Sequence, residues 1–221
     1  MRKPTYDRAF WEQLWSRTLS GPSEHIARRP ANRHLTTEVE HLRPGRAIDA
    51  GCGHGSDTLW LATHGWQVTA VDFSEAALAH GRSTAEGAGA DIAARIRWVE
   101  ADLATWTPQP DHYDLVACLY VHVAGSIDEM VQRMAAAVAP GGTLLLVGHR
   151  PVDPATGAAT PAAGQRQVST DTATAALDPA HWAIVVAEDR PRAAAGTGVD
   201  AVIRARRLAE GHVESFGGIR G

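Results

Sequence analysis

The sequence predicts an α/β fold, in which a mostly parallel sheet is covered by helices on both faces. Segments with strand and helix patterns alternate along the chain, as in folds built from strand–helix–strand units. Residues 113–121 are apolar at nearly every position, which is typical of a central parallel strand. A cluster of glycines follows an earlier apolar segment, and open α/β sheets build their ligand sites at such strand ends.

The predicted elements of the first half alternate between strand and helix. A polar stretch with aromatic anchors precedes them and ends in a helical segment at residues 32–42. Gly65 stands where a helix C-terminus favours a residue that tolerates positive φ, and Ser74 is suited to cap the start of a helix. The predicted strands and helices, in order, are residues 46–50, 56–64, 67–71, 75–86 and 96–99.

The second half continues the alternation after the apolar strand at residues 113–121. Ser126 and Glu129 predict a capping box at the start of a helix, which the Pro-Gly-Gly run from Pro140 ends. Residues 150–167 are rich in Pro, Ala, Gly and Thr and predict a long loop, of a kind that is usually functional or mobile. The remaining predicted elements are strands at residues 143–147, 183–187 and 200–205 and a weak helix at residues 171–177.

Composition and charge argue against several classes of protein. The 221 residues fit one α/β domain, and the formal net charge of −4 argues against a broad surface for nucleic acid. The sequence contains neither a long apolar run that would span a membrane nor the apolar stretch of a secretory signal. Cys52 and Cys118 lie in apolar motifs, so no disulfide is expected, and the histidines lack the pairing of a metal site. A cytoplasmic and, from its residue usage, bacterial protein is expected.

A glycine-rich turn after the first strand carries the clearest functional signal. The strand ends near Asp49, and Gly51, Gly53 and Gly55 follow at alternate positions before a helix. Glycines there let the backbone turn sharply and let a ligand lie against the main chain. Asp72 ends the second strand about twenty residues later, where an open α/β sheet places an acid for two ribose hydroxyls. Together these features predict a nucleoside-binding site.

The spacing of the glycines favours S-adenosylmethionine over a dinucleotide. The dinucleotide pattern G-x-G-x-x-G/A, counted from Gly51, requires glycine or alanine where Ser56 stands. Asp49 would repel a pyrophosphate, whereas its charge suits the cationic amino group of a methionyl moiety. We therefore expect S-adenosylmethionine as the cofactor.

The motifs as a set resemble those of the class I methyltransferases. Residues 47–74, with the sequence AIDAGCGHGSDTLWLATHGWQVTAVDFS, are similar to the first two motifs of that family. Residues 100–103 (EADL), 113–116 (YDLV) and 139–142 (APGG) are similar to the third motif, the fourth motif and the turn before the fifth strand. The resemblance covers residues 40–206 and implies a Rossmann-like, seven-stranded sheet of order 3-2-1-4-5-7-6 with an antiparallel seventh strand.

The resemblance also implies a role for each residue of these motifs. Asp72 would hold the ribose, and Phe73 would lie against the adenine. Asp102 would accept a hydrogen bond from the exocyclic amine of the adenine, with the backbone of Leu103 beside it. Structural roles stay open for two of them, with Asp72 as a strand-end cap and Asp102 as a turn acid. The methionyl part would be held by Asp49, Gly51, Cys52, Gly53 and Gly55.

The N-terminal segment resembles that of the thiopurine and tellurite-detoxifying methyltransferases, in which it folds over the cofactor as a lid. The resemblance lies in the sequence FWEQLW, which contains Trp11 and Trp15. The alternative is that the two tryptophans, at positions i and i+4, form one apolar helix face that packs on the core. We expect a helical lid at residues 1–43, a methyltransferase domain at residues 44–210 and a flexible tail at residues 211–221.

Residues after the fourth and fifth strands are candidates for the acceptor side, because open α/β sheets build sites at strand carboxyl ends. Tyr120 and His122 follow the fourth strand and are the catalytic candidates. His149 and Arg150 follow the fifth strand and are the substrate-binding candidates. His122 could act as a general base or be structural. Arg150 could bind a carboxylate of the substrate or be exposed in a loop.

The short chain and the N-terminal tryptophans indicate a small-molecule acceptor, with no nucleic acid or membrane partner and a monomer or homodimer as the assembly. Resemblance to the thiopurine and tellurite group implies S-methylation of a thiol, in detoxification or natural-product metabolism. The first alternative is methylation of an oxygen or a nitrogen of a secondary metabolite. The more remote alternatives are a nicotinamide oxidoreductase, which Ser56 disfavours, and a catalytically silent cofactor-binding regulator.

Overall fold

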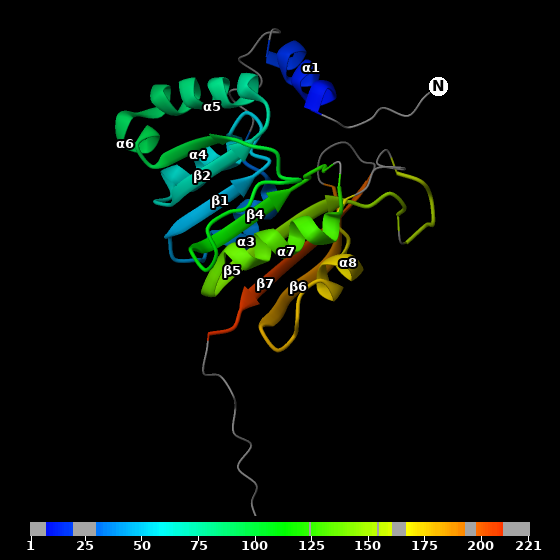
Figure 1. Cartoon of the computed structure of the whole chain (residues 1–221). Coiled ribbons are helices and arrows are strands. Elements are labelled where there is room, and N and C mark those ends of the chain that lie inside the picture. The colour runs from blue at the N-terminus through cyan, green and yellow to red at the C-terminus, as the bar shows by residue number, and fades with distance from the viewer. Residues whose placement is uncertain are drawn as a thin grey trace, which may run out of the picture.

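The computed structural model describes residues 8–19, 30–123, 125–153, 155–160, 167–192 and 198–209. Its strands are β1 (Arg46–Ala50), β2 (Gln67–Asp72), β3 (Ile96–Glu100), β4 (Tyr113–Leu119), β5 (Val138–His149), β6 (Trp182–Pro191) and β7 (Val199–Arg207). They form a seven-stranded sheet in the order β3-β2-β1-β4-β5-β7-β6, so the predicted order is confirmed (Figure 1). Neighbouring strands are parallel except that β7 is antiparallel to β5 and β6.

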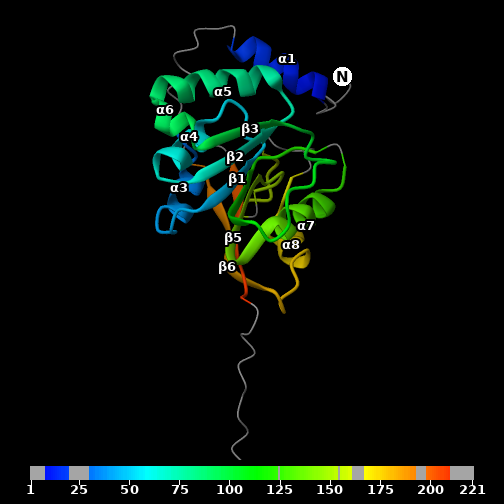
Figure 2. The same cartoon turned by 60° about the vertical axis from the view of Figure 1, so that its left-hand side comes forward.

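Helices lie on both faces of this sheet, as predicted (Figure 2). The helices are α1 (Arg8–Leu19), α3 (Arg33–Val39), α4 (Ser56–Thr63), α5 (Glu75–Ala88), α6 (Ala90–Ala93), α7 (Ile127–Ala137) and α8 (Thr170–Ala175). None of these described helices has both the length and the apolar character needed to cross a membrane. The predicted tail at residues 211–221 and part of the predicted loop, residues 161–166, lie outside the described residues.

Alternate residues of β5 show that both faces of the sheet are buried. Leu144 and Leu146 pack with α7 in one apolar cluster, whereas Leu145 and Val147 pack with α3 and α4 in another. A smaller cluster joins α5 to β2 on the second of these faces. Because successive side chains of a strand point to opposite faces, a strand covered on both sides reads as a continuous apolar run.

The predicted capping residues accept hydrogen bonds at the N-termini of two helices, α5 and α7. Ser74 accepts a hydrogen bond from a backbone amide of the first turn of α5. Ser126 accepts one from the backbone amide of Glu129 at the start of α7, which is the first half of the predicted capping box. In the part of the chain that the structure describes, both halves of such a box are found at α8, between Ser169 and Thr172.

Several elements differ in extent from those predicted. β4 ends at Leu119 rather than at residue 121, because Tyr120 has a φ of 55° and leaves the extended conformation. β5 begins at Val138 and β6 continues to Pro191, so both strands extend beyond their apolar centres. The sequence pattern does not anticipate α6, because its four residues are too few to show a helical period.

Two features of the topology bring polar side chains to one edge of the sheet. The strand order reverses between β1 and β4, so the loop after β1 lies beside the loop after β4. Because β7 runs antiparallel to β5, its first residues lie at the carboxyl end of β5, where Asp200 is opposite His149. This carboxyl edge carries the candidate site.

Candidate cofactor and acceptor site

A cavity of about 1130 Å³ opens along the carboxyl edge of the sheet. Ligand pockets typically measure about 300–1,000 Å³, so this one has room for a nucleoside cofactor and a second small molecule. The predicted site residues that line it are Trp11, Trp15, Gly51, Cys52, Gly53, Asp72, Phe73, Asp102, Leu103, Tyr120, His122 and His149. Asp49, Gly55 and Arg150 are not part of its lining.

The turn after β1 requires glycine at two positions that face the cavity. Gly51 and Gly53 have φ values of 76° and 52°, in the left-handed region that glycine adopts without strain. A Cβ on Gly53 would lie 2.7 Å from Cζ2 of Trp15, so a larger residue would displace that ring. The missing Cβ of Gly53 therefore makes room for the Trp15 ring beside the cavity.

Asp72 connects the end of β2 to this turn. One oxygen of its carboxylate accepts a hydrogen bond from the N–H of Gly53 at 2.9 Å, and the other accepts one from the N–H of Ser74 at 2.9 Å. Asp72 also lines the cavity, and burial raises the pKa of its carboxyl group. The same side chain thus caps the strand end and faces the ligand space, so the two predicted roles are compatible.

Two further acids lie close to the turn. Asp49 is 3% exposed and accepts a hydrogen bond from the hydroxyl of Thr58 at 2.5 Å. Burial and then the charge of Asp57 raise the pKa of Asp49 to about 7. Burial also raises the pKa of Asp57 to about 6, and its carboxylate accepts a hydrogen bond from the N–H of Asn32 at 2.6 Å. Sequence reasoning missed Asp57, although an acid in the first turn after a glycine cluster was a visible signal.

The three acids Asp49, Asp57 and Asp72 have no ion-pair partner in the part of the chain that the structure describes. A buried carboxylate without a cation is costly to ionise, and a nearby positive charge restores the ionised form. The amino and sulfonium groups of S-adenosylmethionine would supply that charge, so these three carboxylates fit the predicted cofactor.

Two of the predicted cofactor residues also have structural roles that explain their identity. Gly55 has a φ of 87°, and a Cβ there would lie 2.7 Å from Cη2 of Trp98. This glycine makes room for the Trp98 ring and does not line the cavity. Asp102 lines the cavity, but its carboxylate accepts a hydrogen bond from the N–H of Ala104 at 2.8 Å, as a turn acid does.

One face of α1 covers the glycine turn. The ring centroid of Trp11 lies 5.2 Å from that of His122, and the centroid of Trp15 lies 5.3 Å from that of His54. No described residue of α1 belongs to the three buried apolar clusters of the sheet. The helix lies against α5, outside the sheet core (Figure 1). Its two tryptophans line the cavity beside the glycine turn.

A buried carboxylate organises the opposite end of the cavity. Asp200, near the start of β7, is 1% exposed. Its Oδ1 lies 2.8 Å from Nδ1 of His149 and 3.2 Å from Nε of Arg192. Its Oδ2 accepts a hydrogen bond from the Tyr120 hydroxyl at 2.8 Å and lies 3.3 Å from Nε2 of His34. We call these five residues the Asp200 cluster.

The pKa values of two members of the Asp200 cluster, Asp200 and Tyr120, are shifted by their surroundings. Burial opposes ionisation of Asp200, but the hydrogen bonds from His149, His34 and Tyr120 outweigh it and hold the pKa of Asp200 well below its usual value. Burial raises the pKa of Tyr120, whose hydroxyl donates to the carboxylate of Asp200. The Tyr120 ring also stacks on His149, with 4.1 Å between centroids. These contacts hold Tyr120 in its left-handed backbone conformation.

His122 lies on the cavity wall between Trp11 and Gln167. Its Nε2 is 2.9 Å from Nε2 of Gln167, and because an amide nitrogen only donates, the imidazole nitrogen accepts. Desolvation and then the nearby His149 lower the pKa of His122 to about 4. The ring is therefore neutral near neutral pH and is a weak base.

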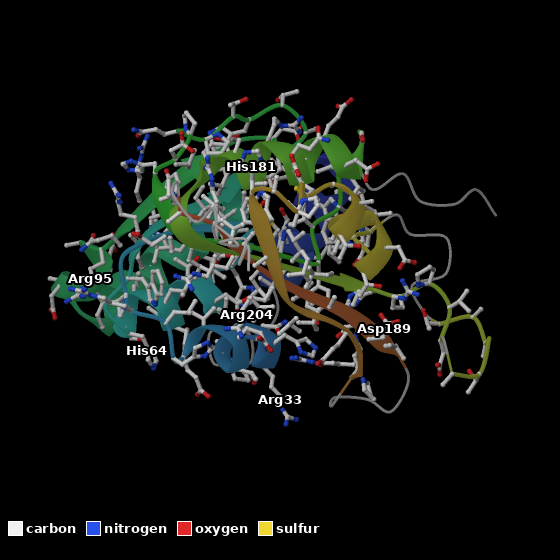
Figure 3. All side chains as sticks on the ribbon, turned by 90° about the horizontal axis from the view of Figure 1, so that it is seen from below. Arg33, His64, Arg95, His181, Asp189 and Arg204 are labelled. Carbon is white, nitrogen blue, oxygen red and sulfur yellow. The ribbon has the colours of Figure 1, made fainter. Side chains whose placement is uncertain are left out.

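The structure does not bring Arg150 to the predicted acceptor site. Its Nε lies 3.3 Å from Oδ1 of Asp189, which is labelled on β6 in Figure 3. Arg150 borders a separate cavity of about 400 Å³ beside α7 and α8. The arginine at the acceptor end is Arg192, which follows β6. Sequence reasoning missed Arg192, Asp200 and His34, because they are distant in sequence and only the reversed β7 brings them together.

Comparisons with known proteins agree with this geometry. Residues 47–142 match the family described as a methyltransferase domain. A trans-aconitate 2-methyltransferase of Paracidovorax citrulli is 32% identical over 136 residues, which are 60% of this chain and 49% of that protein. The chain spans about half the length of the curated relatives it matches.

Two solved structures share the fold. The 1,6-didemethyltoxoflavin-N1-methyltransferase of Burkholderia thailandensis, with bound 1,6-didemethyltoxoflavin and S-adenosylhomocysteine, has a TM-score of 0.60 and 23% identity. That likeness covers 94% of this chain and 93% of the other. An S-adenosylmethionine-dependent methyltransferase of Geobacter sulfurreducens in complex with S-adenosylhomocysteine has a TM-score of 0.51 and 27% identity, over 64% of this chain and 58% of the other.

Proposed function

Because the chain carries a class I S-adenosylmethionine-dependent methyltransferase domain, we propose that it methylates a small-molecule thiol. When bound, the cofactor supplies a methyl group that its sulfonium activates for attack by an anion. The chain's own task is to bind the cofactor, to align the acceptor and to exclude water. The glycine turn with its acids supports the first half of this proposal, and the Asp200 cluster with His122 supports the second.

Under this proposal, the residues around the glycine turn hold the cofactor. Gly51 and Gly53 would lie against its methionyl part, since both glycines line the cavity. Asp49 would act through its charge from behind the turn, because it does not line the cavity. Asp72 would accept hydrogen bonds from the ribose, and Phe73 would border the adenine.

Neither catalytic candidate, His122 or Tyr120, is suited to remove a proton from the acceptor near neutral pH, and this favours a thiol as the acceptor. His122 has a pKa of about 4, and the hydroxyl proton of Tyr120 is held by Asp200. His149 faces Asp200 through Nδ1, and Nη2 of Arg192 contacts both of its ring nitrogens. An acceptor that arrives as an anion needs no base, and a thiol of pKa about 8.5 provides a useful thiolate fraction near neutral pH.

An ionised carboxylate meets the same condition, so O-methylation of a carboxylic acid is the second candidate. The relative from Paracidovorax citrulli is named for trans-aconitate, which is such an acid. An alcohol or an amine that needs help to lose its proton fits the described site less well, because neither His122 nor Tyr120 supplies that help.

A matched pair of acceptors tests the proposal. Methyl transfer from S-adenosylmethionine to thiophenol and to phenol is measured as a function of pH, in the wild type and in His122→Gln. The thiophenol rate is expected to follow the thiolate fraction, with the variant within about threefold of the wild type, because His122 removes no proton. Phenol is expected to react about 100-fold more slowly near neutral pH, because it ionises less.

The opposite pattern would overturn the choice of a thiol. It consists of phenol turnover equal to or faster than thiophenol turnover, together with a loss of about 10²–10⁴-fold in His122→Gln over the whole pH range. Arg150→Gln is the control variant, because Arg150 pairs with Asp189 outside the large cavity. Its rates with both acceptors should equal those of the wild type.

A further inference from the structure

We propose that the acceptor carries a carboxylate, which Arg192 binds at the end of the cavity opposite the glycine turn. This inference deepens the proposed methyl transfer and rests on it for the identity of the reaction. It follows from the distribution of charge along the cavity and from the geometry of Arg192.

The two ends of the cavity differ in their balance of charge. At the glycine turn, Asp49, Asp57 and Asp72 form no ion pair with a basic side chain among the described residues. At the other end, the single buried charge of Asp200 is shared by Arg192, by two histidines and by a tyrosine hydroxyl. Among the described residues, one end thus has no ion pair, whereas at the other end the guanidinium of Arg192 pairs with the carboxylate of Asp200.

A second buried carboxylate beside the cavity shows the same excess of basic groups. Glu38 is 4% exposed, and both Nη1 of Arg190, at 2.7 Å, and Nε of Arg204, at 3.2 Å, contact its carboxylate. Figure 3 shows Arg204 on the sheet beside α3. Arg190 also pairs with Glu188, but that side chain is 60% exposed, where water screens the interaction. Basic side chains therefore outnumber the buried acids at this end.

The guanidinium of Arg192 has the geometry to bind an anion. A guanidinium carries five N–H donors in a planar fork, and Asp200 engages the Nε of Arg192 at 3.2 Å. Nη2 contacts the ring of His149, and the guanidinium carbon lies 5.7 Å from the ring centroid of Tyr120. These contacts hold the fork at the cavity wall, where a carboxylate can pair with its remaining donors.

Other arginines are less suitable for this role. Arg33 borders the cavity, but its side chain points outward from α3 in Figure 3. Arg190 already forms ion pairs with Glu38 and Glu188. Arg192 is one-third exposed, at 32%, and lines the cavity, whereas its partner Asp200 is buried. A cationic cofactor at the acidic end and an acid at the basic end would then be aligned by opposite charges.

Two thiols that differ only in a carboxylate test this inference. The probes are 2-mercaptobenzoate and thiophenol, with S-adenosylmethionine as the donor. In the wild type, KM for 2-mercaptobenzoate is expected to be about 10- to 100-fold lower, because hydrogen bonds to a charged partner add that much affinity. Arg192→Gln should remove this preference through KM, while S-adenosylhomocysteine affinity stays unchanged. Arg150→Gln should keep the preference.

A binding measurement separates this inference from the proposed reaction. Benzoate is titrated into the complex with S-adenosylhomocysteine, and Arg192→Gln is expected to weaken it about tenfold or more. If Arg192→Gln loses its fold, Arg192→Lys serves instead, because it keeps the charge but lacks the fork and should bind benzoate more weakly than the wild type.

Each outcome has a distinct meaning. The carboxylate site would be overturned if the wild type had equal KM values for the two thiols. It would also be overturned if the preference and benzoate binding persisted in a folded Arg192 variant. Either result would leave methyl transfer intact. Arg192-dependent benzoate binding without turnover of either thiol would support the anion site and overturn thiol methylation.

Discussion

Asp72 makes two contacts with the glycine turn and faces the ligand space. We predict that Asp72→Ala weakens S-adenosylmethionine binding by about 2 kcal/mol or more, because hydrogen bonds to a charged group contribute about 1.5–3 kcal/mol each. Asp91→Asn, at an exposed acid of α6, is the control and should bind normally. Calorimetry that finds unchanged affinity in a folded Asp72→Ala variant would remove the ribose assignment.

The raised pKa of Asp49 predicts that cofactor affinity depends on pH. Burial and the charge of Asp57 raise the pKa of Asp49 to about 7, so much of it is protonated near neutral pH. A cationic ligand favours the ionised form, so binding should release a proton and affinity should fall as pH drops below about 7. Calorimetry in buffers of different ionisation enthalpy measures this proton. Its persistence in Asp49→Asn would assign it to another group.

The residue roles divide into those that local sequence encodes and those that it does not. The glycine turn and Asp72 could be predicted, because they act through backbone geometry within one strand–helix–strand unit. Gly55 shows the limit of spacing alone, since it faces Trp98 rather than the ligand. Asp200 and Arg192 could not be predicted, because their meeting depends on how β7 pairs with β5 and β6.

Among the elements, α1 lies outside the buried apolar clusters of the sheet and borders the cavity. We predict that deleting residues 1–20 leaves a folded domain, since the buried clusters contain no described α1 residue. Cofactor affinity should fall about tenfold or more, because Trp15 covers Gly53 and burying an aromatic side chain contributes about 1.5–3 kcal/mol. Thermal melting and calorimetry separate the two effects.

The outcome of this deletion also decides between the two interpretations of the tryptophans. An unfolded product would favour core packing, and a folded product with unchanged affinity would remove both the lid and the packing role. The sequence predicted this helix through its i, i+4 tryptophans, but which surface they cover depends on α5 and the turn after β1. The end of β4 at Leu119 could not be predicted either, because the positive φ of Tyr120, 55°, has no signature in the sequence.

For the whole molecule, the order of the strands could be predicted because each motif of the resemblance occupies one strand end. The combination of an acidic and a basic end could not, since it joins α3, β6 and β7 to the turn after β1. That combination predicts that KM for an anionic acceptor rises with ionic strength, whereas KM for a neutral thiol changes little. Steady-state kinetics in low and high salt measures the difference, and equal slopes would contradict it.

We propose that the domain transfers a methyl group to an anionic small molecule. The most direct test of this proposal follows methyl-labelled S-adenosylmethionine with thiophenol and the purified chain, and quantifies both products. We predict S-methylated thiophenol and S-adenosylhomocysteine in equal amounts, at a rate that follows the thiolate fraction. Tight cofactor binding with no labelled product from any thiol or carboxylic acid would contradict the claim and indicate a silent cofactor-binding protein.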